Sequence, residues 1–280
     1  MVNPASGAVI YYHIQNKDSV KKLSIEILDA ANNVIRTYAN EKSTQATSNN
    51  SKESDPKVEI RTGLNRFVWD LRHANLPSID NVYIEGSNAG RKVIPGEYTI
   101  RLKINEAEQS AKVKVLADPR YNAPSADFEA QEKWSKLVSE DVTAIHVSVV
   151  QMRKVQDQLN QFVKRAEGNK TLDSLTAKAK AINKVIKVWE EELIQPKSQS
   201  NDDVINFINK LSANLIFLKG EIESSASLPY VTEGQMKRYD ELHAAWGKYE
   251  IQKQSLLTNE IAAFNEACRK ANWNFVGFEN

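Results

Sequence analysis

The sequence has 280 residues, of which 41% are hydrophobic and 26% are charged. That composition excludes a disordered chain, and the length predicts about two domains, since a domain usually holds roughly 100 to 200 residues. The 37 basic and 36 acidic side chains nearly cancel, and no run approaches the ~20 apolar residues of a membrane span. We therefore expect neither a nucleic-acid partner nor a membrane span.

A change of hydrophobic period near residues 118–120 divides the sequence. Before it, apolar residues come in short alternating runs broken by Gly, Pro and Asn, and after it they recur every three or four residues. We therefore predict an α+β multidomain protein. Residues 1–120 are expected to form an all-β, immunoglobulin-like or fibronectin-like sandwich, and residues 121–280 an all-α antiparallel helical bundle.

The first half predicts some seven short strands with frequent turns, as is typical of such a sandwich. The clearest runs lie at 9–14, 23–28, 34–38, 63–72, 95–104 and 111–116. Asn-rich turn chemistry at 29–33 predicts that the second and third runs pair antiparallel, because Asn tolerates a positive φ. Alternation places Trp69 and Tyr98 inward, where large aromatic side chains fill the space between two sheets.

Residues 40–57 are polar and contain almost nothing to bury. This composition predicts a mobile loop or a disordered insertion. A binding loop at one end of the sandwich remains an alternative, although the sequence of this segment does not indicate a ligand.

The motif GLNRFVWDLR at 63–72, followed by PGEY at 95–98, resembles the immunoglobulin-like domain of the flagellar-hook-capping type. With the Asp-Pro-Arg at 118–120 and the LPYVT at 228–232, the chain looks more like the C-terminal region of bacterial secreted proteins with a sortilin-like β-propeller. Many of those proteins carry the label of glycosyl hydrolases with BNR or Asp-box repeats. Neither a blade repeat nor an Asp-box occurs here. The resemblance therefore implies a fragment that lacks the catalytic residues of its parent protein.

The second half predicts four helices with short connections, as in an up-and-down bundle. They are expected at 125–167, 172–193, 204–222 and 232–271. Thr232 and Gln235 form a capping box for the last helix, whose two apolar stripes a stutter near Lys253 would join. Cys268 falls within the second stripe, which favours a buried thiol.

No arrangement of residues identifies a reaction, a cofactor or a metal. The four histidines (His13, His73, His146 and His243) show no metal-ligand spacing, and the last two lie beside apolar stripes, as core or boundary residues do. The carboxylates at 190–192 and 202–203 lie near predicted helix ends, which favours surface or capping roles. Tyr83 and Tyr230 are flanked by loop-like sequence and are the candidate surface contacts.

These observations predict a non-catalytic accessory C-terminal module of a larger secreted bacterial protein. It would support or dock a β-propeller and mediate protein or carbohydrate contacts. A location in the periplasm, at the cell surface or outside the cell follows from the resemblance only, because the first residues show no signal-peptide pattern. Two alternatives stay open: the chain contributes part of a glycoside hydrolase active site, or it is a self-contained interaction or dimerisation module.

Overall fold

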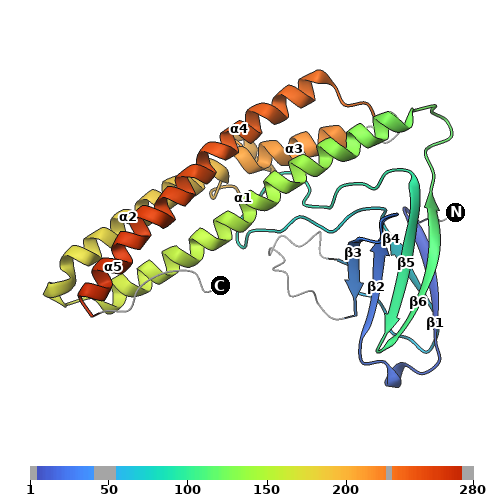
Figure 1. The fold of residues 1–280 in the computed structure, drawn as a ribbon, viewed down its shortest axis with the longest axis horizontal. Helices are drawn as coiled ribbons and strands as arrows, with labels where there is room; N and C mark the ends of the chain where they lie inside the picture. The colour runs from blue at the N-terminus through green and yellow to red at the C-terminus, as the bar shows by residue number, and fades with distance from the viewer. Residues whose placement is uncertain (1–4, 41–54, 225–228, 273–280) are drawn as a thin grey trace. The chain divides into compact units, whose positions relative to one another are not determined.

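The computed structural model describes residues 5–40, 55–224 and 229–272. Most of the predicted loop at 40–57 thus lies outside the described residues. Two antiparallel sheets come first along the chain and helices follow (Figure 1), which confirms the predicted order of sheet and helix.

The chain divides into two compact units. The sheet unit comprises residues 1–80, 87–139 and 218–236, and the helical unit comprises residues 81–86, 140–217 and 237–280. The sheet unit therefore holds some helical residues as well as both sheets. The predicted domain boundary at residue 120 stays a prediction, because compactness alone does not show which part folds by itself.

The sheet unit contains a two-stranded and a four-stranded antiparallel sheet. In the first, β1 (Ala8–Ile14) pairs with β4 (Gly63–Trp69). The second has the order β3-β2-β5-β6, formed by β3 (Val34–Ala39), β2 (Leu23–Leu28), β5 (Gly96–Ile104) and β6 (Ala107–Val115). The described residues thus form six strands.

Local chemistry explains where these strands begin and end. The predicted β2–β3 hairpin is confirmed: the Asp29 carboxylate accepts the Ala31 and Asn33 N–H groups, and Asn32 has φ 65°. β4 ends at Trp69 rather than at residue 72, because Leu71 has φ 60° and leaves the extended region. β6 begins at residue 107, earlier than predicted, directly after a turn in which Asn105 has φ 52°.

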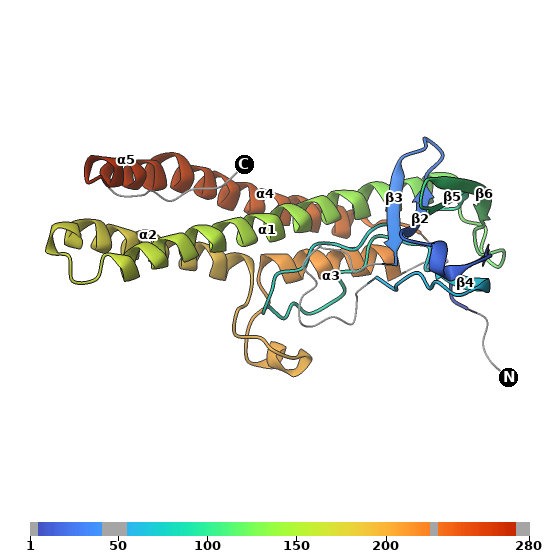
Figure 2. The same cartoon turned by 90° about the horizontal axis from the view of Figure 1, so that it is seen from below.

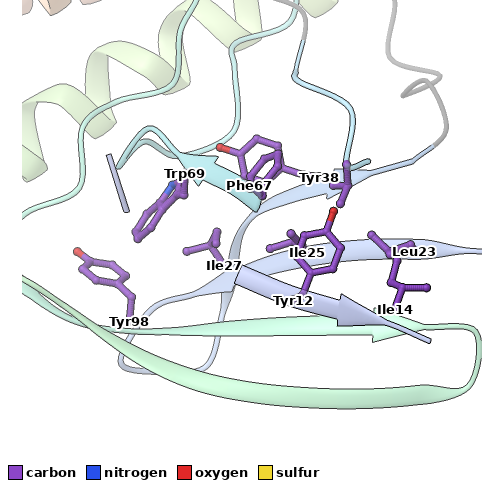
Figure 3. Packing of buried hydrophobic residues seen from close by; sticks show 10 residues of the cluster. Tyr12, Ile14, Leu23, Ile25, Ile27, Tyr38, Phe67, Trp69 and Tyr98 are labelled. Carbon is purple, nitrogen blue, oxygen red and sulfur yellow. The ribbon is translucent and has the colours of Figure 1, made fainter. Parts of the chain in front are cut away.

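The core of the sheet unit fills the space between the two sheets. Figure 3 shows side chains of β1 and β4 meeting those of β2 and β5. Trp69 is fully buried and contacts Tyr98 edge-on, with 5.5 Å between ring centroids, and Tyr38 packs against Phe67 at 4.7 Å. The inward direction predicted for Trp69 and Tyr98 is therefore confirmed.

A buried arginine closes one end of this core. The Arg36 guanidinium pairs with Asp55 and Asp70, and it donates to the Asn75 side chain at 3.2 Å and to the His73 carbonyl at 2.8 Å. Burying a charge is costly unless it is paired and hydrogen-bonded, and here one side chain contacts four groups. Arg36 thus joins β3 to the segments on either side of β4.

Five helical segments and a π-helical turn follow. They are α1 (Ser125–Arg165), α2 (Asp173–Leu193), α3 (Leu211–Ser224), α4 (Glu233–Ser255), the π-turn η4 (Leu256–Ile261) and α5 (Ala262–Lys270). The short 3₁₀ turns η2 (Lys170–Leu172) and η3 (Asn201–Ile205) lie between helices, and a third, η1 (Lys17–Ser19), lies between β1 and β2. In the helical unit, α2 runs beside α1 (Figures 1 and 2). The first and second predicted helices are confirmed to within two residues.

The start predicted for the third helix is too early in the chain. It was expected from residue 204, but α3 begins at Leu211, and Ile208 is 83% exposed. Ser200 and Asp203 form a capping box for η3, which ends near Asn206. Ile208 therefore does not belong to the buried face of α3.

The last predicted helix is confirmed with its cap and its change of register. Thr232 Oγ1 accepts the Gln235 N–H at 3.2 Å, and Gln235 Oε1 accepts the Thr232 N–H at 2.9 Å. The stutter lies in the π-turn, whose i→i+5 bonding adds a residue to one turn. The buried stripe continues from Leu256 to Ile261 across that turn and then to Cys268, which is fully buried as predicted.

Candidate docking groove on the helical unit

A groove of about 650 Å³ opens between α2 and the end of α4. On α2 it is lined by Lys184, Val185, Val188, Trp189 and Glu192, and on the other side by Tyr249, Gln252, Ser255 and Leu256. These residues recur every three or four positions, which places each set on one face of its helix.

The groove exists because α2 carries apolar residues on two faces. Its buried apolar stripe consists of Ala179, Ile182, Ile186, Trp189 and Leu193. Val185 and Val188 lie outside that stripe and are 50% and 55% exposed. A helix that is apolar on more than one face usually buries each of those faces. The second face of α2, which carries Val185 and Val188, is not covered by the described residues.

Polar contacts fix the floor and one rim of the groove. The buried Trp189 donates from Nε1 to the Tyr249 carbonyl at 2.9 Å, which ties α2 to α4. The Tyr249 hydroxyl donates to Glu192 at 3.5 Å, and burial together with the Glu192 charge raises the pKa of Tyr249. That phenol therefore stays neutral at pH 7 and remains a donor.

The two ends of the α2 rim carry opposite charges. Glu192 lies 3.5 Å from the Lys210 ammonium. At the other end, no carboxylate of the described chain lies within ion-pair distance of Lys184. The groove thus combines an apolar floor with one unpaired cation at its edge.

A second, much smaller cavity lies elsewhere in the helical unit. Its volume is about 10 Å³, which is room for about one water molecule, and Tyr83, Ser198 and Ser212 are among its lining residues. Ser212 Oγ lies 2.6 Å from His146 Nε2, and both side chains are fully buried. A serine beside a histidine is a nucleophile–base arrangement, but this space is too small for a carbonyl substrate. Ser198 Oγ is buried there without a hydrogen-bond partner among the described residues, which suits a structural water.

The buried carboxylates each have a basic partner. Asp141 contacts His243 Nδ1 at 2.8 Å, and Glu223 lies 3.0 Å from Arg72. Glu190, for which a surface or capping role was expected, is buried and pairs with Arg153 at 2.6 Å. The expectation failed because Glu190 faces α1, whose Arg153 offsets the desolvation of the carboxylate. These carboxylates thus have structural partners.

The two predicted contact residues belong to different units. Tyr83 is half-buried at the small cavity of the helical unit, and Tyr230 is 64% exposed in the sheet unit. The prediction missed the groove residues on α2. Their signal was the second apolar spacing at Ala181, Val185 and Val188, which lies beside the stronger buried stripe.

Searches for a metal centre and for a membrane helix gave negative results within the described ranges. No group of three or more His, Cys, Asp or Glu residues there could hold a metal ion. No helix in the same ranges is long and apolar enough to cross a bilayer. Comparisons with protein families, with curated proteins and with solved structures found no match to this chain.

Proposed function

We propose that the chain is a non-catalytic accessory module that contacts another protein or another domain of its own parent protein. The observation that carries this proposal is the open apolar groove beside Val185 and Val188. An uncovered apolar surface on an otherwise polar helix face is typical of an interaction site. The pairing of the buried carboxylates with basic groups supports a structural role for those residues.

The resemblance found in the sequence extends this proposal. The sheet region would be an immunoglobulin-like sandwich, and the parent would be a secreted or cell-surface bacterial protein with a sortilin-like β-propeller. The motifs at 63–72 and 95–98 support this reading. The inward packing of Trp69 against Tyr98 is compatible with it.

The test begins with the gene sequence that encodes the region before residue 1. If a propeller is encoded there, we would produce it separately and titrate it with this chain by calorimetry. We expect a complex that Val188→Glu weakens at least tenfold, while Val34→Glu on β3 leaves it unchanged. Val34 is the matched control, because it is 49% exposed, close to the 55% of Val188.

An activity assay provides an independent test. Aryl glycosides would be incubated with the isolated chain and, in parallel, with the full-length protein. We expect no turnover by the isolated chain. Turnover by this chain alone would overturn the non-catalytic proposal and favour the glycoside hydrolase alternative.

A further inference from the structure

We propose that the groove between α2 and α4 binds an amphipathic α-helix of another polypeptide segment. The aliphatic stripe of that helix would pack on Val185, Val188 and Leu256, and one of its carboxylates would pair with Lys184. This inference rests on the proposed function and specifies the class of partner.

The shape of the groove favours a helix. Its walls are two helices, and its α2 side runs from Lys184 to Glu192, about 12 Å at 1.5 Å per residue. That length matches roughly two turns of a partner helix, which presents apolar residues at i, i+3 or i+4, and i+7. A helix laid between two others is also the usual way in which a bundle buries a second apolar face.

The chemistry of the groove favours an aliphatic partner over a sugar. Carbohydrate sites use the exposed face of an aromatic ring, whereas the Trp189 side chain is 3% exposed and its Nε1 is already bonded to Tyr249. Beside the partly exposed Tyr249, whose hydroxyl is bonded to Glu192, the half-exposed apolar groups are the methyls of Val185 and Val188. Covering these methyls removes apolar surface from water at about 25 cal/mol per Å².

The rim charges define the polarity of the partner. Lys184 has no carboxylate partner in the described parts of the chain, so an acidic residue of the partner can occupy that position. Glu192, at the opposite end, already contacts Lys210 and Tyr249, so a basic residue of the partner would join an existing pair there. Such rim pairs contribute more to specificity and association rate than to affinity.

The test uses a fluorescein-labelled, Ala-rich synthetic peptide of about 18 residues, which is long enough for appreciable helicity. It carries Leu at i, i+4 and i+7, with Glu at its N-terminal end and Lys at its C-terminal end. A peptide of identical composition with scrambled Leu positions is the control. We expect saturable anisotropy for the first peptide, with an affinity at least tenfold tighter than for the scrambled one.

Variants locate the binding site. Val188→Glu should weaken binding at least tenfold, whereas Val34→Glu on β3 should not change it. Lys184→Glu should weaken binding about threefold, as expected for an exposed pair, and a peptide with Lys in place of its Glu should restore the loss. Equal binding of the scrambled peptide, or full binding by Val188→Glu, would overturn the helix proposal.

The chain's own residues 273–280 are the competing occupant, since they include Trp273, Phe275 and Phe278 and lie outside the described residues. Peptide binding that appears only after truncation at Asn272 would assign the groove to that segment and overturn the proposal. If neither peptide binds but the upstream region still forms a complex that Val188→Glu disrupts, the helix inference fails and the docking function stands. If no partner binds in either experiment, both proposals fail.

Discussion

In the sheet unit, aromatic side chains such as Trp69 and Tyr98 fill the space between the two sheets. In the helical unit, the interfaces between helices also contain buried charged and hydroxyl groups. There, Lys253 donates to Ser148 at 2.8 Å, and both side chains are buried. The sheet unit also buries charged groups, but these are more fully compensated: the Arg36 guanidinium contacts four other groups, and Glu223 pairs with Arg72 and Lys219. Among the residues that the structure describes, Lys253 has one hydrogen-bond partner, and it lies 5.9 Å from the Trp246 ring.

The core between the sheets is thus held by apolar packing, whereas the helical unit contains a buried charge, Lys253, with few polar partners. In an apolar core, the free energy of unfolding depends on how completely side chains fill the interior, because a deleted side chain leaves a cavity. A buried charge with few partners contributes little net stability, because its desolvation offsets what its contacts return. The helical unit also leaves the α2 groove open, whereas the sheet core is covered. We therefore expect the two regions to respond differently to substitution.

The largest expected effect tests the sheet core. Trp69→Ala removes a fully buried indole and should lower the free energy of unfolding by about 3–5 kcal/mol. Tyr11→Ala is the matched control, because Tyr11 lies on the paired strand β1 and is exposed. Urea unfolding followed by far-UV circular dichroism measures both variants. Equal losses for the two would contradict the picture of an apolar core between the sheets.

The second prediction concerns pH and the sheet unit. Burial, followed by the charge of Arg91, lowers the pKa of His73 to about 4. The unfolded chain binds this proton near pH 6.5. The contribution of neutral His73 to the free energy of unfolding should therefore be fully present above that pH and should fall by about 2–3 kcal/mol as the pH drops to about 4. Urea titrations at stepped pH would measure the slope. His73→Gln should flatten it, and an unchanged slope in that variant would assign the acid sensitivity to other groups.

A third substitution addresses the polar interior of the helical unit. Lys253→Met alone should cost about 1–2 kcal/mol, because it leaves the Ser148 hydroxyl buried without its partner. The pair Lys253→Met with Ser148→Ala should be as stable as the wild type or more stable by about 1–2 kcal/mol. Thermal and urea unfolding of both variants check this order. A double variant less stable than the wild type would show that the buried Lys253–Ser148 pair contributes net stability.

The smallest effect sharpens the contrast between a covered core and an open groove. Val188→Thr keeps the branched shape and should change the free energy of unfolding by less than about 0.5 kcal/mol, because the side chain is half-exposed. Val142→Thr, at a fully buried position of α1, is the comparison and should cost more than 1 kcal/mol. Similar losses would mean that the groove face is covered within the chain itself.

Periodicity and capping in the sequence predicted most of the elements. Alternation correctly placed Trp69 and Tyr98 inward, and the spacing of Thr232 and Gln235 correctly started α4. The predicted start of α3 was wrong. The apolar spacing at Ile208 extended the helical pattern into a segment that forms a 3₁₀ turn followed by an irregular loop. Spacing alone does not show where the backbone leaves a helix.

The site was less accessible to sequence reasoning. Lys253, Ser148 and Glu190 are polar, so a pattern of apolar residues cannot mark them as buried. Their positions depend on partners from other helices, which are long-range contacts. Val185 and Val188 were readable as apolar residues, but only the packing of α2 against α4 shows that they face an open groove.

The π-turn at Leu256–Ile261 has a consequence for how length changes are tolerated in this region. Deleting one residue between Leu256 and Ile261 would allow an uninterrupted α-helix, and everything beyond it would keep its rotation around the helix axis, because the π-turn holds one residue more than an α-turn. Phe264, which contacts Phe162 edge-on at 5.2 Å, would then keep that contact. The π-turn is thus a place where the chain tolerates a one-residue deletion, whereas a deletion within the regular turns of α4 would rotate α5 by about 100° and turn Phe264 away from α1.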